Sequence, residues 1–558
     1  MNTAERAARI EAITLELTKY FSVCETAEEA KMGEVIYTML AEIPYFRQHP
    51  ENLRCLPIEG DPWGRMSVLA LLRGEKCPSS KAVVTIGHFD TVGISDYGVL
   101  APYANQPDVL REKLLALELP EHVRNDLQSG DYLFGRGVFD MKSGDAVLIQ
   151  LLEELSEQVD VLEGNIIFGA VCDEESNSRG MLRLVPELER MQREEGLDYL
   201  AMLDTDCMTA EYDGDKNRYI YTGTVGKIMP TFYIVGKETH AGEAFKGLDP
   251  NLLAAALTKR IDMNPDFCDI VSGEVTLPPV TLQLRDRKTE YSTQIAKTAV
   301  VFFNYGTYCS NPDVVLTNMT NIAEACFEGT IVSINEHYKK FCKMAGRPFR
   351  ALSWKTRVIT YQELYHAVRE EVGDSLDKLV QNKCAKWLAD DSLDTCGRTT
   401  KLVEFVHSLW SDQSPVIIVY FTPPYYPHTH VKGTTKKEQK LLAAIERALA
   451  GEKSVYPVKI KKFFPCISDL SYGASPDSPD ALRAVANNMP GFGSIYKLPI
   501  EELARLKIPV SMIGTYGYDA HKYTERLEKG YSFETMPGIL RRIIGNLLSE
   551  DGTSAVPQ

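Results

Sequence analysis

The sequence predicts an α/β protein in which a largely parallel, doubly wound domain is interrupted by an inserted α+β domain. Over the first two hundred residues, short apolar runs alternate with amphipathic helical segments, which is typical of a parallel sheet covered on both faces. This alternation lapses near residue 213 and returns near residue 415. We therefore predict one discontinuous domain, 1–215 with 412–558, and an insert at 216–411.

Local periodicity predicts the elements in order. Before the insert, helices are expected at 7–21, 27–42, 142–158 and 181–194, and strands at 67–72, 82–86, 164–172 and 199–203. The insert should contain an antiparallel hairpin (219–224 and 227–235), helices at 251–262 and 317–343, strands at 280–284, 299–305 and 351–360, and a charged helical segment at 361–410. Strands at 415–421 and 510–513 and helices at 436–450 and 537–548 complete the chain.

Composition excludes several classes of protein. The net charge of −16, with acidic and basic residues mixed, argues against nucleic acid as a partner. No apolar stretch is long enough to span a membrane, and the first helix is amphipathic rather than a leader sequence. The 12 cysteines form no Cys-x-x-Cys pair, so we expect them to be reduced and the protein to be cytoplasmic.

The first motif that indicates chemistry closes the strand at 82–86. His88 and Asp90 follow it, and an imidazole is a good zinc ligand that a nearby carboxylate can orient. A second acid, Asp140, lies between glycines where the helix 142–158 begins. It could be a simple helix cap, but the flanking glycines favour a carboxylate that the backbone brings close to metal ions.

Three further motifs follow apolar strands. The triplet Asp173-Glu174-Glu175 could be a solvated acidic turn, but its position after a strand favours a bound cation. Asp204 and Asp206 follow the strand at 199–203, and either can be a ligand because both point to the same face. With His521 after the last strand, the set holds two imidazoles and three carboxylates. It suits a pair of Zn²⁺ ions, with Co²⁺ or Mn²⁺ as alternatives.

The order of these motifs resembles the dinuclear metallohydrolases that include aminoacylase, carboxypeptidase G, acetylornithine deacetylase and succinyl-diaminopimelate desuccinylase. The matching stretches are 87–90, 137–144, 173–175, 236–242, 467–469 and 520–521. Within this family, residues 222–227 and 247–251 and the length of the chain resemble bacterial arginine-utilisation proteins of the Roc type. The resemblance implies a catalytic domain at 1–215 and 412–558 and a lid or dimerisation domain at 216–411, hence a homodimer.

The resemblance also implies a ligand set. His88 would bind one metal ion, Asp140 would bridge both, and Glu175 and His521 would bind the other. The acid after the fourth strand completes the first ion; the family spacing points to Asp204, with Asp206 left open.

Catalytic roles are implied in the same way. Asp90 would orient its neighbouring histidine, and Glu174 would be the general base that activates a water bound to both metal ions. His240, in the insert, would assist the developing oxyanion, although it could be an ordinary loop histidine. Family members usually present an arginine to the substrate carboxylate; here the comparable strand carries Asn304, which can hydrogen-bond a carboxylate or an amide.

The expected activity is metal-dependent hydrolysis of an amide bond, in an N-acyl amino acid or a small peptide-like substrate, by attack of a dizinc-bound hydroxide. A role in arginine or amino-acid catabolism follows from the Roc-type resemblance. The alternative is a catalytically silent metal-binding or regulatory protein that retains the fold. A complete set of ligands and a base favours the enzyme.

Overall fold

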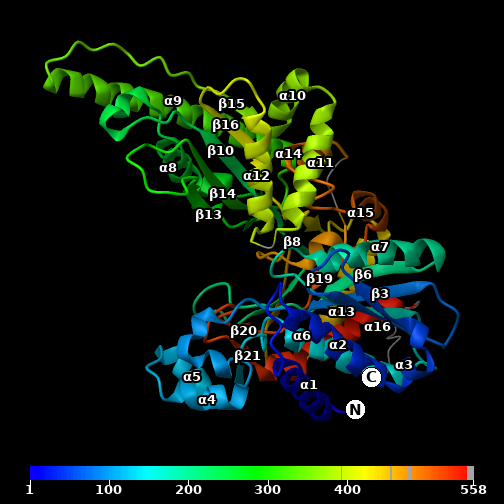
Figure 1. The fold of residues 1–558 in the computed structure, drawn as a ribbon. Coiled ribbons are helices and arrows are strands. Elements are labelled where there is room, and N and C mark those ends of the chain that lie inside the picture. Colours follow the sequence, from blue (N-terminus) through cyan, green and yellow to red (C-terminus); the bar gives the residue numbers. More distant parts are fainter. Residues whose placement is uncertain (391, 453–454, 475–478, 550–558) are drawn as a thin grey trace. The chain divides into compact units, whose positions relative to one another are not determined.

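The computed structural model describes residues 1–390, 392–452, 455–474 and 479–549 (Figure 1). Contacts within the chain separate two compact units, each described by itself below. Unit 1 comprises Met1–Thr224, Thr429–Ser475 and Pro499–Gln558, and unit 2 comprises Val225–His428 and Pro476–Leu498.

Unit 1 is built on an eight-stranded sheet in the order β1-β2-β5-β3-β6-β19-β7-β18. Four neighbouring pairs (β5–β3, β3–β6, β6–β19 and β7–β18) are parallel and three are antiparallel, so the predicted mostly parallel sheet is confirmed. The strands are β1 (Leu53–Pro57), β2 (Met66–Arg73), β3 (Lys81–His88), β5 (Asn165–Val171), β6 (Asp198–Asp204), β7 (Arg218–Tyr221), β18 (Val458–Lys461) and β19 (Val510–Met512).

Helices cover both faces of this sheet. Successive residues of β5 point to opposite faces, and a Cβ at Gly169 would lie 2.5 Å from Leu184 of helix α7 (Arg179–Glu194). The next residue of β5 is level with Gly87 of β3, where a Cβ would lie 2.4 Å from Asp145 of helix α6 (Lys142–Ser156). Helices α6 and α7 therefore lie on opposite faces, as the doubly wound prediction requires.

The remaining elements of unit 1 are short strands and helices around this sheet. The helices are α1 (Thr3–Thr18), α2 (Ala27–Glu42), α3 (Pro44–Gln48), α4 (Pro107–Leu115), α5 (Glu121–Ser129), α6 (Lys142–Ser156), α7 (Arg179–Glu194), α13 (Lys436–Ala450), α15 (Ile500–Leu506) and α16 (Met536–Leu548). A small sheet joins β20 (Gly517–Tyr518), β21 (Arg526–Glu528) and β4 (Tyr132–Phe134), and β8 (Gly223–Thr224) pairs with β17 (Thr429–His430).

Unit 2 has its own sheet, with strand order β13-β14-β10-β16-β15 and β9 paired to β14. The strands are β9 (Gly226–Ile228), β10 (Pro230–Val235), β13 (Val280–Asp286), β14 (Thr298–Thr307), β15 (Val358–Thr360) and β16 (Val416–Phe421), and β11 (Ile270–Val271) pairs with β12 (Glu274–Val275). The helices are α8 (Pro250–Ile261), α9 (Pro312–Met344), α10 (Tyr361–Val372), α11 (Ser375–Leu388), α12 (Thr395–Ser408) and α14 (Pro479–Asn488).

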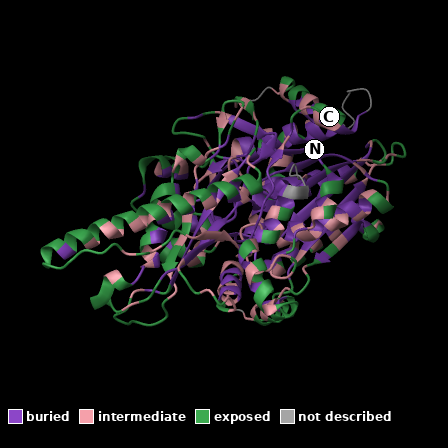
Figure 2. Cartoon of the chain, turned by 90° about the horizontal axis from the view of Figure 1, so that it is seen from above, coloured by how far each residue is buried: buried purple, intermediate pink, exposed green. Residues whose placement is uncertain are grey.

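The helical segment predicted at 361–410 forms α10, α11 and α12. Their apolar side chains form one core with Tyr233 and Val235 of β10 and with Ile418 of β16. Strand residues of both sheets are mostly buried (purple in Figure 2), whereas every residue of β13 is at least partly exposed. The apolar side chains of this charged helical segment therefore form part of the core of unit 2.

Two sequence predictions differ from the structure in how strands pair. The predicted hairpin is wrong: β7 joins the sheet of unit 1 beside β18 and β19, whereas β10 pairs with β14 and β16 in unit 2. The sequence also predicts a domain boundary at 411/412, but β16 pairs with β10 and β15. In both cases the partner strand is distant in sequence, and local periodicity does not identify it.

One buried histidine of unit 2 should make stability depend on pH. Burial, and then the charges of Lys297 and Arg357, lower the pKa of His407 to about 4. The unfolded chain binds this proton below pH ~6.5 and the folded chain does not. We therefore expect the free energy of unfolding to fall by up to about 3 kcal/mol as the pH drops from ~6.5 to ~4.

Urea unfolding at several pH values measures this effect. The variant His407→Leu should flatten the acid side of the profile, because it removes the group that binds the proton. His366→Leu, at an exposed position of α10, serves as the control and should keep the wild-type slope. Equal slopes in all three proteins would contradict the assignment to His407.

Within the residues that the structure covers, no helix combines the length and apolarity needed to cross a membrane.

Candidate metal centre

The predicted motifs of unit 1 meet at one edge of its sheet. Strands β5, β3, β6 and β19 are parallel neighbours, so their carboxyl ends lie side by side. His88 is the last residue of β3, Glu174 and Glu175 follow β5, and Asp206 follows β6. In an open α/β sheet this edge is where ligands bind.

Asp140 lies between two imidazoles. Its Oδ1 is 3.2 Å from Nε2 of His88, and its Oδ2 is 3.1 Å from Nε2 of His521. The second imidazole also lies 3.0 Å from Oε1 of Glu175. A carboxylate whose two oxygens face two different imidazoles has the geometry of a bridging ligand.

Two more carboxylates complete the cluster. Oε2 of Glu174 is 3.9 Å and Oδ1 of Asp206 is 3.8 Å from Nε2 of His88. Ligand atoms of His88, Asp140 and Glu175 lie within 4.8 Å of one another, and those of Asp140, Asp206 and Cys207 do the same. The strand ends therefore bring together nitrogen, oxygen and sulfur donors.

Asp90 connects the first motif to the third. Its backbone oxygen lies 3.1 Å from Nδ1 of His88, and its carboxylate accepts hydrogen bonds from the backbone N–H groups of Glu174 (3.1 Å) and Glu175 (3.0 Å). It is buried and therefore fixes the imidazole and the acidic turn relative to each other.

The geometry favours Asp206 over Asp204 at the end of β6. Among the described residues Asp204 makes no ion pair with His88 or His521; its Oδ2 accepts a hydrogen bond from Ser468 Oγ (2.7 Å), and its Oδ1 accepts one from the backbone N–H of Asp206 (3.1 Å). The backbone of Gly514 packs so closely here that a Cβ would lie 1.7 Å from the carbonyl oxygen of Asp206. The turn at Asp206 is therefore held both by its hydrogen bond to Asp204 and by the close packing of Gly514.

Two residues that sequence reasoning missed hold the backbone at Asp140. Glu525 accepts hydrogen bonds from the backbone N–H groups of Phe139 (3.2 Å) and Asp140 (3.3 Å). Arg136 pairs with it at 2.6 Å, and burial raises the pKa of this glutamate to about 7. Glu525 is remote in the sequence, and no local pattern marks it.

His521 is positioned by a charged loop. Its φ of 66° lies in the left-handed region, which few non-glycine residues adopt. The preceding Asp519, also at positive φ, accepts hydrogen bonds from Arg526 Nη1 (2.5 Å) and Thr524 Oγ1 (2.9 Å). These contacts stabilise the strained turn that orients the imidazole towards Asp140.

The electrostatics fit bound cations. Burial, together with neighbouring acids, raises the pKa of Asp206 and Glu174 well above the usual range for carboxyl groups. Hydrogen bonds to Asp140 and Glu175 raise the pKa of His521 to about 10. So many buried acids repel one another unless positive charge lies between them. The imidazole and carboxylate donors match what divalent zinc-like ions prefer.

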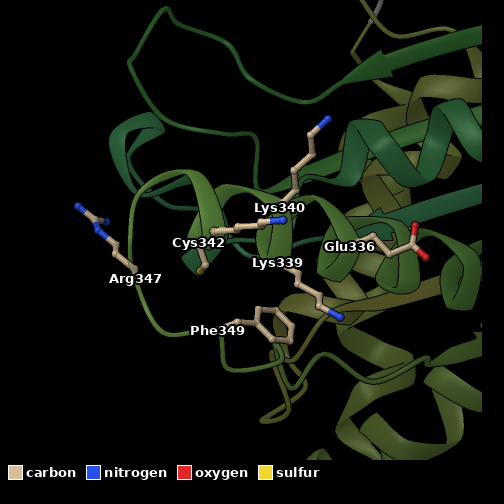
Figure 3. A pocket seen from close by; sticks show the side chains of 7 residues that line it. Glu336, Lys339, Lys340, Cys342, Arg347 and Phe349 are labelled. Carbon is tan, nitrogen blue, oxygen red and sulfur yellow. The ribbon is translucent and has the colours of Figure 1, made fainter.

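Two predicted residues lie in unit 2. His240 is exposed, and its Nδ1 accepts a hydrogen bond from the backbone N–H of Gly242 at 3.0 Å. Asn304 is on β14, and its buried Oδ1 accepts no hydrogen bond from the described residues. A hollow of about 480 Å³ at the end of α9 contains neither of them; its lining is Glu336, Lys339, Lys340, Cys342, Lys343, Arg347 and Phe349 (Figure 3).

The fold and the donor set define a metal-binding hydrolase that acts on C–N bonds. The chain belongs to peptidase family M20/M25/M40, whose model matches residues 108–472. It is 33% identical to the protein RocB of Bacillus subtilis (strain 168) over 550 residues, covering 98% of this chain and 96% of that protein. It is also 33% identical to the YqjN protein of the same organism over 544 residues, covering 97% and 96%.

A solved structure shows the same fold. The di-peptidase Dug1p from Saccharomyces cerevisiae superimposes with a TM-score of 0.53 at 11% sequence identity, covering 98% of each chain. This likeness confirms the predicted fold class, and the match to the family model together with the similarity to RocB confirms the predicted family.

Proposed function

We propose that the chain hydrolyses an amide bond in a small N-acyl amino acid or peptide-like substrate at a centre of two divalent metal ions, preferably Zn²⁺. The observation that carries this proposal is Asp140, whose two carboxylate oxygens face two different imidazoles at 3.2 and 3.1 Å. His88 and Asp206 would hold one ion, and Glu175 and His521 the other. When bound, the ions lower the pKa of water and polarise the amide carbonyl.

Side chains of the protein would then transfer the protons of the reaction. Glu174 would take a proton from the attacking water and return it to the nitrogen of the leaving amine. The backbone N–H of Glu174 donates to Oδ1 of Asp90 at 3.1 Å, which holds Glu174 beside the metal-binding side chains. The carboxylate of Glu174 is in neither group of candidate metal ligands. His240 would stabilise the oxyanion, a role supported by the family resemblance and not by a contact within unit 2.

The proposed substrate class is supported by the net charge of the chain and by the side-chain oxygen of Asn304. The Oδ1 of Asn304 accepts no hydrogen bond from the part of the chain that the structure describes, so it has the capacity to accept one from a substrate N–H group. Together with the net charge of −16 and the Roc-type resemblance, this favours an arginine-derived or other cationic amide from amino-acid catabolism. Cytoplasmic localisation stays a prediction.

Metal analysis and a substrate panel test the proposal. The chain would be stripped with a chelator, reloaded with Zn²⁺, Co²⁺ or Mn²⁺, and assayed on N-acyl amino acids, including N-acyl arginines, and on dipeptides. We expect two ions per chain and hydrolysis that disappears on chelation and returns on reloading. Fewer than two ions after reloading, or hydrolysis indifferent to chelation, would refute the dinuclear mechanism.

We also infer a homodimer formed through unit 2. The strand β13 lies at the edge of its sheet and exposes three apolar side chains, Val280, Leu282 and Leu284. A second copy could cover them. Light scattering of the purified chain should give twice the chain mass, and a monomer at micromolar concentration would contradict this inference.

A further inference from the structure

A cysteine lies among the carboxylates of the centre. Sγ of Cys207 and one carboxylate oxygen each of Asp140 and Asp206 all lie within 4.8 Å of one another. The backbone N–H of Cys207 donates to Oδ1 of Asp206 at 2.6 Å, so both side chains belong to one tight turn after β6. The ligand set that the family resemblance implies contains no sulfur donor.

The spacing suits a single ion. A zinc ion binds thiolate sulfur at about 2.3 Å and carboxylate oxygen at about 2.0–2.2 Å, which keeps its donors within about 4.5 Å of one another. The spacing of these three atoms, within 4.8 Å of one another, is close to that limit.

The surroundings of this thiol differ from those of a core cysteine. Cys172, which directly precedes the acidic triplet that begins at Asp173, is fully buried, and its Sγ lies 3.9 Å from the hydroxyl of Ser67. Cys207 is only partly buried, and its Sγ lies within 4.8 Å of a carboxylate oxygen of both Asp140 and Asp206. The thiolate form of this cysteine would be repelled by the carboxylates unless a cation lay between them, and the thiolate is the form that binds metal.

We propose that Cys207 is a sulfur ligand of the metal centre, beside Asp140 and Asp206. The proposal rests on the proposed function, because it requires a metal ion at these donors. On binding, the S–H bond breaks, the proton passes to solvent, and the sulfur lone pair forms the bond to the metal, so no oxidant or reductant is needed. A thiolate at this position favours Zn²⁺, Co²⁺ and Cd²⁺ over Mn²⁺ and Mg²⁺.

Cobalt spectroscopy of the full chain is the direct test. Co²⁺ bound to thiolate gives a near-ultraviolet charge-transfer band that oxygen and nitrogen ligands do not give. We expect this band in the wild type, its loss in Cys207→Ser, and its retention in Cys466→Ser. Cys466 is the matched control because the charges of Asp206 and Asp140 also act on its thiol, but it is in neither donor group.

The outcomes separate this inference from the proposed function. Two cobalt ions per chain without the band would overturn the sulfur ligand and leave the dinuclear centre intact. Loss of the band in Cys466→Ser instead of Cys207→Ser would also overturn it. A wild-type chain that binds no cobalt would overturn both proposals.

Metal preference gives a second readout that a structural role would not change. In Cys207→Ser the ratio of Cd²⁺ affinity to Mn²⁺ affinity should fall by about tenfold or more, because only the softer ion loses a preferred ligand. Cys466→Ser should keep the wild-type ratio. If Cys207→Ser lowers the affinities for Cd²⁺ and Mn²⁺ equally, the cysteine supports the fold and does not bind metal.

Discussion

Replacing Glu174 by glutamine is expected to lower kcat by about 10²–10⁴-fold while leaving the metal content unchanged. Its carboxylate lies 3.9 Å from Nε2 of His88 but is in neither donor group at the centre. Burial raises its pKa well above the usual range for glutamate, which suits a group that takes a proton and later returns it. Glutamine keeps the shape of this side chain and removes the basic oxygen.

Glu175→Gln is the matched control on the same turn. Glu175 lies 3.0 Å from Nε2 of His521 and within the donor group of His88 and Asp140, so its replacement should lower metal content as well as activity. The measurements are kcat on the best amide of the panel and metal ions per chain. Wild-type kcat in Glu174→Gln would show that another group is the base, and metal loss in that variant would make Glu174 a ligand.

Much of this edge of the sheet could be predicted because parallel strands end together. An imidazole after β3 and acids after β5 and β6 must meet if those strands are neighbours, and the order β5-β3-β6-β19 makes them neighbours. The bridging position of Asp140 was implied by the family motif, and its contacts with His88 and His521 agree with that expectation. The ligand roles themselves stay predictions.

The choice between Asp204 and Asp206 could not be made from the strand itself. Both residues point to the same face, since side chains along a strand repeat every two residues. What distinguishes them is that Ser468 donates a hydrogen bond to Asp204, whereas Asp206 lies 3.8 Å from Nε2 of His88. A contact between residues so distant in sequence leaves no local signal. The same reason explains the wrong hairpin and the unforeseen support of Asp140 by Glu525.

The sequence also did not predict a buried cluster of ion pairs around Arg65. Arg65 is fully buried, and its guanidinium lies 2.6 Å from Asp173, 2.7 Å from Asp61 and 3.0 Å from Glu29. These residues come from three separate segments and show no common periodicity. Asp173 has a φ of 68° and directly precedes Glu174, so the cluster holds the strained start of the acidic turn.

Replacing Arg65 by methionine should therefore destabilise the protein by about 3–5 kcal/mol, because it leaves buried carboxylates without their cation. Arg179 still pairs with Asp61 at 3.0 Å, but neither Asp173 nor Glu29 has another ion pair among the described residues. The measurement is the free energy of unfolding of the full chain in urea. Methionine is the chosen replacement because it fills much of the same space without charge.

The matched control is Arg73→Met, at the other end of β2. That side chain is 40% exposed and pairs with Glu195 at 2.7 Å, so its loss should cost no more than about 1 kcal/mol. Arg65→Lys should fall between the two, because lysine keeps the charge but cannot reach three carboxylates with a planar group. Equal unfolding free energies for Arg65→Met and Arg73→Met would mean that the cluster is no more important than a surface ion pair. A large difference would identify Arg65 as the residue that makes an acidic turn beside the metal centre compatible with a stable fold.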